Sequence, residues 1–69
     1  MKNKLKELRQ KENISQDDLA SILKVSRQTI NSIETGKFDP SLKLVMKITK
    51  HFAVALEEIF IYEEKKWPL

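Results

Sequence analysis

The sequence predicts an all-α protein of five short helices that ends in a short strand or tail. Three observations support this fold class. Apolar residues recur at the three- and four-residue spacing of helices that bury one face. A serine, which is a favoured residue for capping a helix N-terminus, precedes three of these segments. Near the C-terminus the pattern changes, because Phe60, Ile61 and Tyr62 form a β-branched and aromatic run.

Chain length and composition limit the classes of protein that remain. Sixty-nine residues suffice for a single domain with a small core. We expect a helical domain over residues 1–60 and a tail over residues 61–69. The sequence has no cysteine, which excludes disulfides and thiolate-metal sites. The longest uncharged apolar run, Phe52–Leu56, is too short to span a membrane. We therefore expect a cytoplasmic protein that does not associate with a membrane.

Basic residues are concentrated in the first part of the chain. The net charge is +3, yet residues 1–50 contain eleven Lys and Arg against six Asp and Glu, and residues 51–69 contain two against four. A basic surface attracts phosphate groups of any nucleic acid. Scattered lysines also simply keep a protein in solution, so charge alone does not decide between these interpretations.

The first helix is expected just after the first four residues, with Leu5 and Leu8 on its inner side. Arg9 lies one turn beyond Leu5 on the same face. We therefore expect the Arg9 side chain to face the core rather than water.

Two further helical segments follow so closely that only a tight turn can join them. The earlier one begins at Ser15, with Asp18 three residues later as a weak capping box. The later one begins at Ser26 and closes at Gly36, which has no Cβ to hinder the left-handed conformation that ends many helices. Ala20 is small and lies where the two helices must cross closely. This arrangement is typical of a helix-turn-helix.

The later of these two helices has one polar face and one apolar face. At about 100° per residue, its polar side chains fall on one arc of roughly 140°, and Ile30 and Ile33 lie opposite. The polar side chains on this arc are Arg27, Gln28, Asn31, Ser32 and Thr35. The major groove of DNA admits one α-helix and displays a distinct pattern of donors and acceptors for each base pair. The pattern therefore predicts that this face contacts DNA.

The remaining segments are expected to complete the core and the tail. Ser41 caps a fourth helix that carries Lys43 on its outer side, and a short fifth helix is expected over Leu56–Phe60. Beyond it, apolar residues remain that the five helices do not need. A frayed tail is the simplest interpretation of a terminus. Exposing large apolar side chains is unfavourable for a small protein, however, so we expect the tail to join two copies of the chain. The predicted interface residues are Phe60, Ile61, Tyr62 and Trp67.

The segment ISQDDLASILKVSRQTINSIETGKFDPSLKLVMKI resembles the Cro/CI/Xre family of transcriptional regulators. The similarity extends from about Leu5 to Phe60, and its most specific parts are SQxxLA, VSRQTIxxIExGK and PSL. The family often has glycine in the turn where this chain has Lys24, which would place Lys24 at positive φ at a cost of about 1 kcal/mol. The resemblance implies a lambda-repressor-like DNA-binding domain. It also implies a homodimeric repressor that binds an inverted-repeat operator in double-stranded DNA.

The residue pattern and the resemblance together assign roles to individual side chains. Base contacts are expected from Arg27, Gln28, Asn31 and Ser32. Phosphate contacts are expected from Gln16, Thr35, Lys37 and Lys43. The resemblance further implies a structural ion pair between Arg9 and Glu34. Because Glu34 lies near the edge of the polar arc, the alternative is that its carboxylate accepts a hydrogen bond from cytosine.

Two other functions remain open from the sequence. One is the antitoxin of a toxin–antitoxin pair, which would bind both DNA and a toxin protein. The other is a helical protein-interaction module that does not bind DNA. An enzyme is not expected, because the sequence shows neither a nucleophile paired with a base nor a cluster of metal ligands. We expect no cofactor, no metal and no small-molecule ligand.

Overall fold

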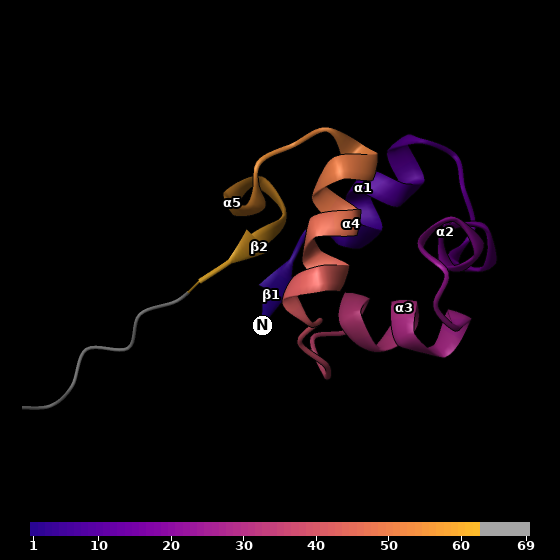
Figure 1. The fold of residues 1–69 in the computed structure, drawn as a ribbon, viewed down its shortest axis with the longest axis horizontal. Coiled ribbons are helices and arrows are strands. Elements are labelled where there is room, and N and C mark those ends of the chain that lie inside the picture. Colours follow the sequence, from indigo (N-terminus) through magenta and orange to yellow (C-terminus); the bar gives the residue numbers. More distant parts are fainter. Residues whose placement is uncertain (63–69) are drawn as a thin grey trace, which may run out of the picture.

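The computed structural model describes residues 1–62 as five helices and one two-stranded sheet (Figure 1). The elements are β1 (Lys2–Asn3), α1 (Leu5–Lys11), α2 (Gln16–Leu23), α3 (Arg27–Glu34), α4 (Leu42–Phe52), α5 (Leu56–Ile59) and β2 (Phe60–Ile61). The predicted five-helix fold is confirmed. The fifth helix is one residue shorter than expected, because Phe60 is already extended and belongs to β2. None of the described helices is long and apolar enough to cross a membrane.

Serine caps determine where three of the helices begin. The Oγ atoms of Ser15, Ser26 and Ser41 each accept a hydrogen bond from the backbone N–H three residues later, at 3.0, 3.1 and 3.2 Å. Asp18 completes the capping box predicted for α2, since its Oδ2 accepts from the Ser15 N–H at 3.2 Å. Each such cap satisfies a backbone donor that the helix leaves unpaired and contributes about 1 kcal/mol.

Each of the helices α1 to α4 is followed, within two residues, by a residue in the left-handed conformation. Lys24 has φ 59°, which confirms the expectation from the missing glycine, and Gly36 has φ 77°. Asn13 and Ala53 adopt φ 58° and 55°, and neither was predicted. The left-handed conformation brings Cβ close to the following carbonyl oxygen, so it is less favourable at Lys24 and Ala53 than it would be at glycine.

The core contains residues from all five helices. Its fully buried side chains are Leu5, Leu19, Ile30, Ile33, Ile48 and Ile59. Ala20 is also buried, where α2 and α3 pack closely against each other. Arg9 is buried as well, on the same side of α1 as Leu5. A small core of this kind positions α3 with its apolar side inward.

The first residues of the chain form a strand, although they are too short and polar to be assigned from sequence. Lys2 pairs with Ile61, and Asn3 pairs with Phe60, in an antiparallel arrangement. The predicted C-terminal strand is therefore present, but its partner along this edge is β1 of the same chain. Phe60 is buried in the core. Because β2 covers residues 60 and 61, it spans the predicted boundary between the helical domain and the tail.

Candidate nucleic-acid interface

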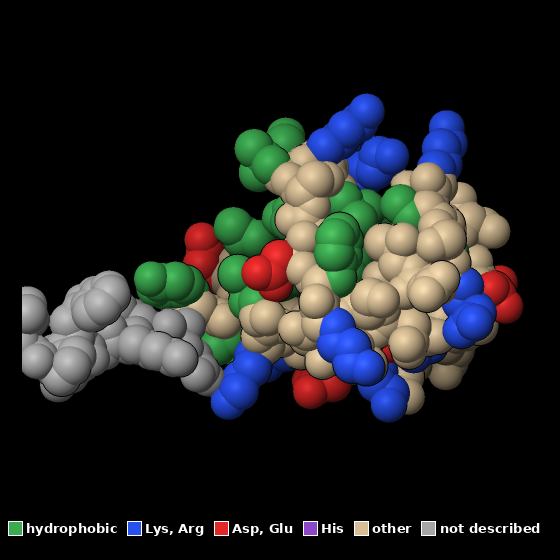
Figure 2. All heavy atoms as spheres, turned by 90° about the horizontal axis from the view of Figure 1, so that it is seen from below, with side chains coloured by type: hydrophobic (Ala, Val, Ile, Leu, Met, Phe, Trp, Pro, Cys, Tyr) green, Lys and Arg blue, Asp and Glu red, His purple; other side chains and the backbone are tan. Residues whose placement is uncertain are grey.

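Helix α3 and the loop after it form the lower edge of the molecule in Figure 1. Ile30 and Ile33 are completely buried on the inner side of α3. Arg27, Gln28 and Asn31 are exposed on its outer side. Figure 2 views the molecule from below this edge and shows a mainly uncharged polar surface around α3, with Lys and Arg side chains beside it. Such a surface offers directional hydrogen bonds in the middle and positive charge at the rim.

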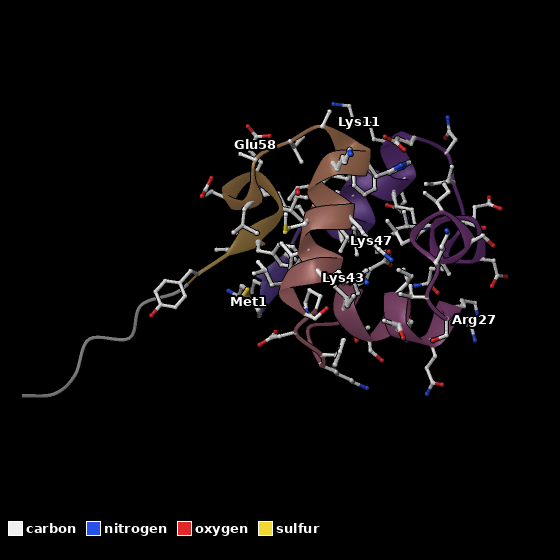
Figure 3. The ribbon with its side chains drawn as sticks, viewed as in Figure 1. Met1, Lys11, Arg27, Lys43, Lys47 and Glu58 are labelled. Carbon is white, nitrogen blue, oxygen red and sulfur yellow. The ribbon has the colours of Figure 1, made fainter. Side chains whose placement is uncertain are left out.

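The predicted base-contacting residues differ in how freely they are presented. Arg27 lies at the start of α3 and extends away from the core (Figure 3). Its Nε is 3.9 Å from Asp17 Oδ1, and both side chains are exposed. An ion pair of this length and exposure contributes little, so it does not hold Arg27 in place. Ser32 is partly buried, so of the four it is the least accessible to a ligand.

Gln16 and Asn31 are directly connected, which the sequence did not predict. Gln16 Nε2 donates to Asn31 Oδ1 at 3.2 Å and to Glu34 Oε1 at 3.1 Å. The first turn of α2 is thereby tied to the outer face of α3. Gln16 was expected to contact phosphate. Without DNA, both hydrogens of its amide nitrogen are engaged within the helix-turn-helix, so this expectation stays a prediction.

Arg9 and Glu34 form a bidentate ion pair beneath this surface. Arg9 Nε donates to Glu34 Oε2 at 2.7 Å, and Nη2 donates to Oε1 at 3.2 Å. The third nitrogen, Nη1, donates to the carbonyl oxygen of Ile14 at 2.9 Å. The hydrogen bond to Glu34 raises the pKa of Arg9, while burial acts in the opposite direction. The two side chains are only 11% and 3% exposed, which places the carboxylate inside the protein rather than at its edge.

The residues expected to contact phosphate lie around α3 rather than together. Thr35 Oγ1 donates to the carbonyl oxygens of Asn31 and Ser32 at 3.0 and 3.2 Å, so its hydroxyl hydrogen is used within α3. Lys37 is exposed in the loop after α3. Lys43 is exposed at the end of α4 that is closest to α3 (Figure 3). The two lysines are therefore available to an approaching anion.

Another α4 lysine has a structural contact that sequence reasoning missed. Lys47 Nζ donates to the carbonyl oxygen of Leu23, the last residue of α2, at 3.3 Å. A cation near the C-terminal end of a helix complements the partial negative charge there.

Near the C-terminal end of α4, His51 Nε2 lies 3.0 Å from Glu12 Oε1. Within residues 1–62, no group of three His, Cys, Asp or Glu residues is arranged to hold a metal ion.

Two capped helices joined through residues 24–26, with the second presenting a polar outer face, define the molecule as a helix-turn-helix domain. The family model for the helix-turn-helix matches residues 5–59 of the chain. The chain therefore belongs to the Cro/CI/Xre-type helix-turn-helix family of transcriptional regulators.

Individual proteins support this assignment. The chain is 62% identical over 64 residues to an uncharacterized HTH-type transcriptional regulator of Methanocaldococcus jannaschii, covering 93% of this chain and 97% of that protein. It is 46% identical over 65 residues to an uncharacterized HTH-type regulator, YgzD, of Bacillus subtilis, covering 94% and 98%. The crystal structure of a transcriptional regulator from Listeria innocua superimposes with a TM-score of 0.78 over 99% of this chain and 67% of that one. At 15% identity, the latter shows a shared fold.

Proposed function

We propose that this protein is a sequence-specific repressor that inserts α3 into the major groove of its operator. The observation that carries the proposal is the two-sided character of α3. Ile30 and Ile33 are fully buried, so the helix cannot rotate away, and the opposite side presents Arg27, Gln28 and Asn31. Arginine pairs well with guanine and amide side chains pair well with adenine, so these three residue types suit direct reading of bases.

Phosphate contacts beside α3 would orient the helix in the groove. Lys37 follows α3 directly, and Lys43 lies at the neighbouring end of α4, so both are placed to approach the DNA backbone. Such contacts fix the register of a protein on DNA without reading its sequence. Thr35 lies at the same end of α3 and is included among these contacts, in which its hydroxyl hydrogen would turn from the carbonyl oxygens of α3 to a phosphate. Occupation of a promoter in this way would repress transcription by excluding other proteins from it.

The proposal includes a homodimer, because one helix-turn-helix covers only a few base pairs and two half-sites lie roughly 34 Å apart on B-DNA. Of the residues predicted to form the interface, Phe60 is buried in its own core, whereas Ile61 and Tyr62 are exposed. Trp67 lies outside the described residues. Ile61 and Tyr62 are therefore the described part of the tail that remains available to a second copy.

A larger apolar surface lies next to these tail residues and supports the proposal of a dimer. Leu42 and Met46 on α4 are 74% and 62% exposed, and Leu56 on α5 is also exposed. Figure 2 shows hydrophobic side chains gathered on the part of the molecule that holds α4 and α5. We call the surface formed by Leu42, Met46, Leu56 and Tyr62 the α4–α5 face. A small protein rarely leaves such residues uncovered.

The charges beside the α4–α5 face suit a second copy of the same chain. Leu42 separates two shallow grooves. One groove is bordered by the basic residues Lys47 and Lys50, and the other by the acidic residues Asp39 and Glu57. A two-fold axis along the line between the two grooves, at Leu42, would place the basic border of one copy against the acidic border of the other. Opposite charges would then flank an apolar centre, as self-complementary interfaces require.

Selection of duplexes from a random pool tests the proposed function directly. We expect the wild-type chain to enrich an inverted repeat with half-sites about one helical turn apart. Binding should weaken steeply with salt, because phosphate contacts release counterions. If no sequence is enriched and binding is equally weak for all duplexes, the domain is a protein-interaction module rather than an operator-binding protein.

A further inference from the structure

We propose that Glu34 sets the direction of a hydrogen-bond chain through Gln16 to Asn31, and that this chain holds the Asn31 amide in the orientation that selects adenine over guanine. The inference rests on the DNA-reading function proposed above and names residues that determine its specificity. Gln16 and Glu34 act here as positioning residues, since neither needs to touch a base.

The direction of the chain begins at a group that can only accept. Glu34 Oε2 accepts from Arg9 Nε at 2.7 Å, and Oε1 accepts from Arg9 Nη2 at 3.2 Å. The carboxylate is almost completely buried and faces a guanidinium, so both of its oxygens act as acceptors. An ionised carboxylate has no hydrogen to donate. Any neighbour that bonds to it must therefore supply the hydrogen.

Gln16 transmits this direction to the outer face of α3. An amide side chain alone could turn over and exchange its oxygen and nitrogen. Beside Glu34 Oε1, only the nitrogen is favourable, because the amide oxygen would face the carboxylate oxygen. Gln16 Nε2 accordingly donates to Glu34 Oε1 at 3.1 Å and uses its second hydrogen on Asn31 Oδ1 at 3.2 Å. The orientation of the exposed Asn31 amide is thus determined by a buried charge.

The fixed orientation determines what Asn31 offers to DNA. Its Nδ2 keeps both hydrogens for a ligand, and its Oδ1 keeps one lone pair beside Gln16. Adenine presents an acceptor, N7, next to a donor, the N6 amino group, and this order matches the asparagine amide. Guanine presents two acceptors, N7 and O6, so its O6 would face the fixed amide oxygen. An asparagine that could turn over would still oppose its oxygen to N7 or O6 of guanine, and for part of the time it would also take the orientation that mismatches adenine.

Two duplexes that differ in one base pair test the inference. The position read by Asn31 is first located in the selected operator as the one whose preference disappears in Asn31→Ala. Dissociation constants are then measured with adenine or guanine at that position. We expect the wild-type protein to prefer adenine by about tenfold or more. In Gln16→Ala, this ratio should fall by about twofold to threefold, because the Asn31 amide is then no longer held in the orientation that matches adenine.

Three comparisons separate positioning from other roles. Gln16→Ala leaves the Arg9–Glu34 pair intact, so its thermal unfolding should resemble that of the wild type. Adding Gln16→Ala to Asn31→Ala should leave the ratio unchanged, because Gln16 acts through Asn31. Lys37→Ala serves as the matched control and should weaken binding to both duplexes equally. Glu34→Gln can offer hydrogens to Gln16 and so reverse the chain, and it should also lower the ratio if it folds.

The inference is overturned if Gln16→Ala weakens both duplexes equally and keeps the wild-type ratio, because Gln16 would then be a phosphate contact. It is also overturned if Asn31→Ala keeps every base preference of the wild type. These results differ from a failure of the proposed function, in which the wild-type chain itself enriches no sequence.

Discussion

Asn3 Nδ2 donates a 2.8 Å hydrogen bond to the carbonyl oxygen of Ile33, so the N-terminal strand is attached to the last turn of α3. The same side chain accepts from the Leu5 N–H through Oδ1 at 3.1 Å, at the start of α1. One asparagine thus links the beginning of the first helix to the end of the helix proposed to enter DNA. This link also helps to place β1 beside β2.

Replacing Asn3 by alanine should lower the free energy of unfolding by about 1–2 kcal/mol. The variant loses the hydrogen bond that Oδ1 accepts from the Leu5 N–H and the one that Nδ2 donates to the Ile33 carbonyl oxygen. Urea denaturation followed by circular dichroism measures this change. Lys6→Ala, on the exposed side of α1, is the control and should stay within about 0.5 kcal/mol of the wild type. Equal stability of the two variants would contradict the role assigned to Asn3.

Replacing Glu34 by alanine should lower the free energy of unfolding by about 3–5 kcal/mol, because the buried Arg9 guanidinium would lose its partner. Thermal melting of the free protein checks this prediction. The double variant Arg9→Met with Glu34→Leu should recover part of the loss, since it leaves no charge in the core. A Glu34→Ala protein that melts like the wild type, with altered operator choice, would instead support the alternative that Glu34 accepts from cytosine.

Replacing Lys37 by alanine should weaken binding to all duplexes alike and reduce the slope of log affinity against log salt by about one. Titrations of the selected operator and of an unrelated duplex at several salt concentrations measure both effects. Lys11→Ala is a charge-matched control, because Lys11 lies on the side of the molecule away from α3 in Figure 3. A change in base preference in Lys37→Ala would show that Lys37 reads sequence.

Introducing a charge on the α4–α5 face should disrupt the proposed dimer. Met46→Glu places a carboxylate in the apolar centre of the face, so sedimentation should show a monomer. The affinity of this monomer for an isolated half-site should not exceed that of the wild type. Ile22→Glu adds the same charge at another exposed apolar residue, on α2, and should leave the dimer intact. If Met46→Glu remains dimeric, a chain truncated after Phe60 tests whether the tail alone joins the two copies.

Replacing Ala53 by glycine should stabilise the protein by about 1 kcal/mol, because glycine adopts the left-handed conformation at this helix end without the Cβ penalty. Ala53 is exposed, so little packing is lost. Ala55→Gly is the matched control, because Ala55 has ordinary extended angles and gains nothing from glycine. Thermal denaturation of the two variants should therefore move in opposite directions.

The helices and their boundaries could be predicted because their determinants are local. Ser15, Ser26 and Ser41 cap backbone groups only three residues away, so the spacing is visible in the sequence itself. The apolar positions Ile30 and Ile33 likewise follow from the helical period. The left-handed turn at Lys24 was expected from the resemblance, whereas the one at Ala53 had no residue to indicate it.

The connections among these helices were decided by the tertiary structure. Asn3 and Ile33 are thirty residues apart, and Gln16 and Asn31 are fifteen apart, so each pair meets only once the helices have packed. A two-residue strand such as β1 also has no alternating pattern from which to predict it. By itself, the sequence determined which residues form the polar side of α3. Folding decided which of those residues remain free, because packing of α2 and β1 against α3 brings hydrogen-bond partners to some side chains and leaves others exposed.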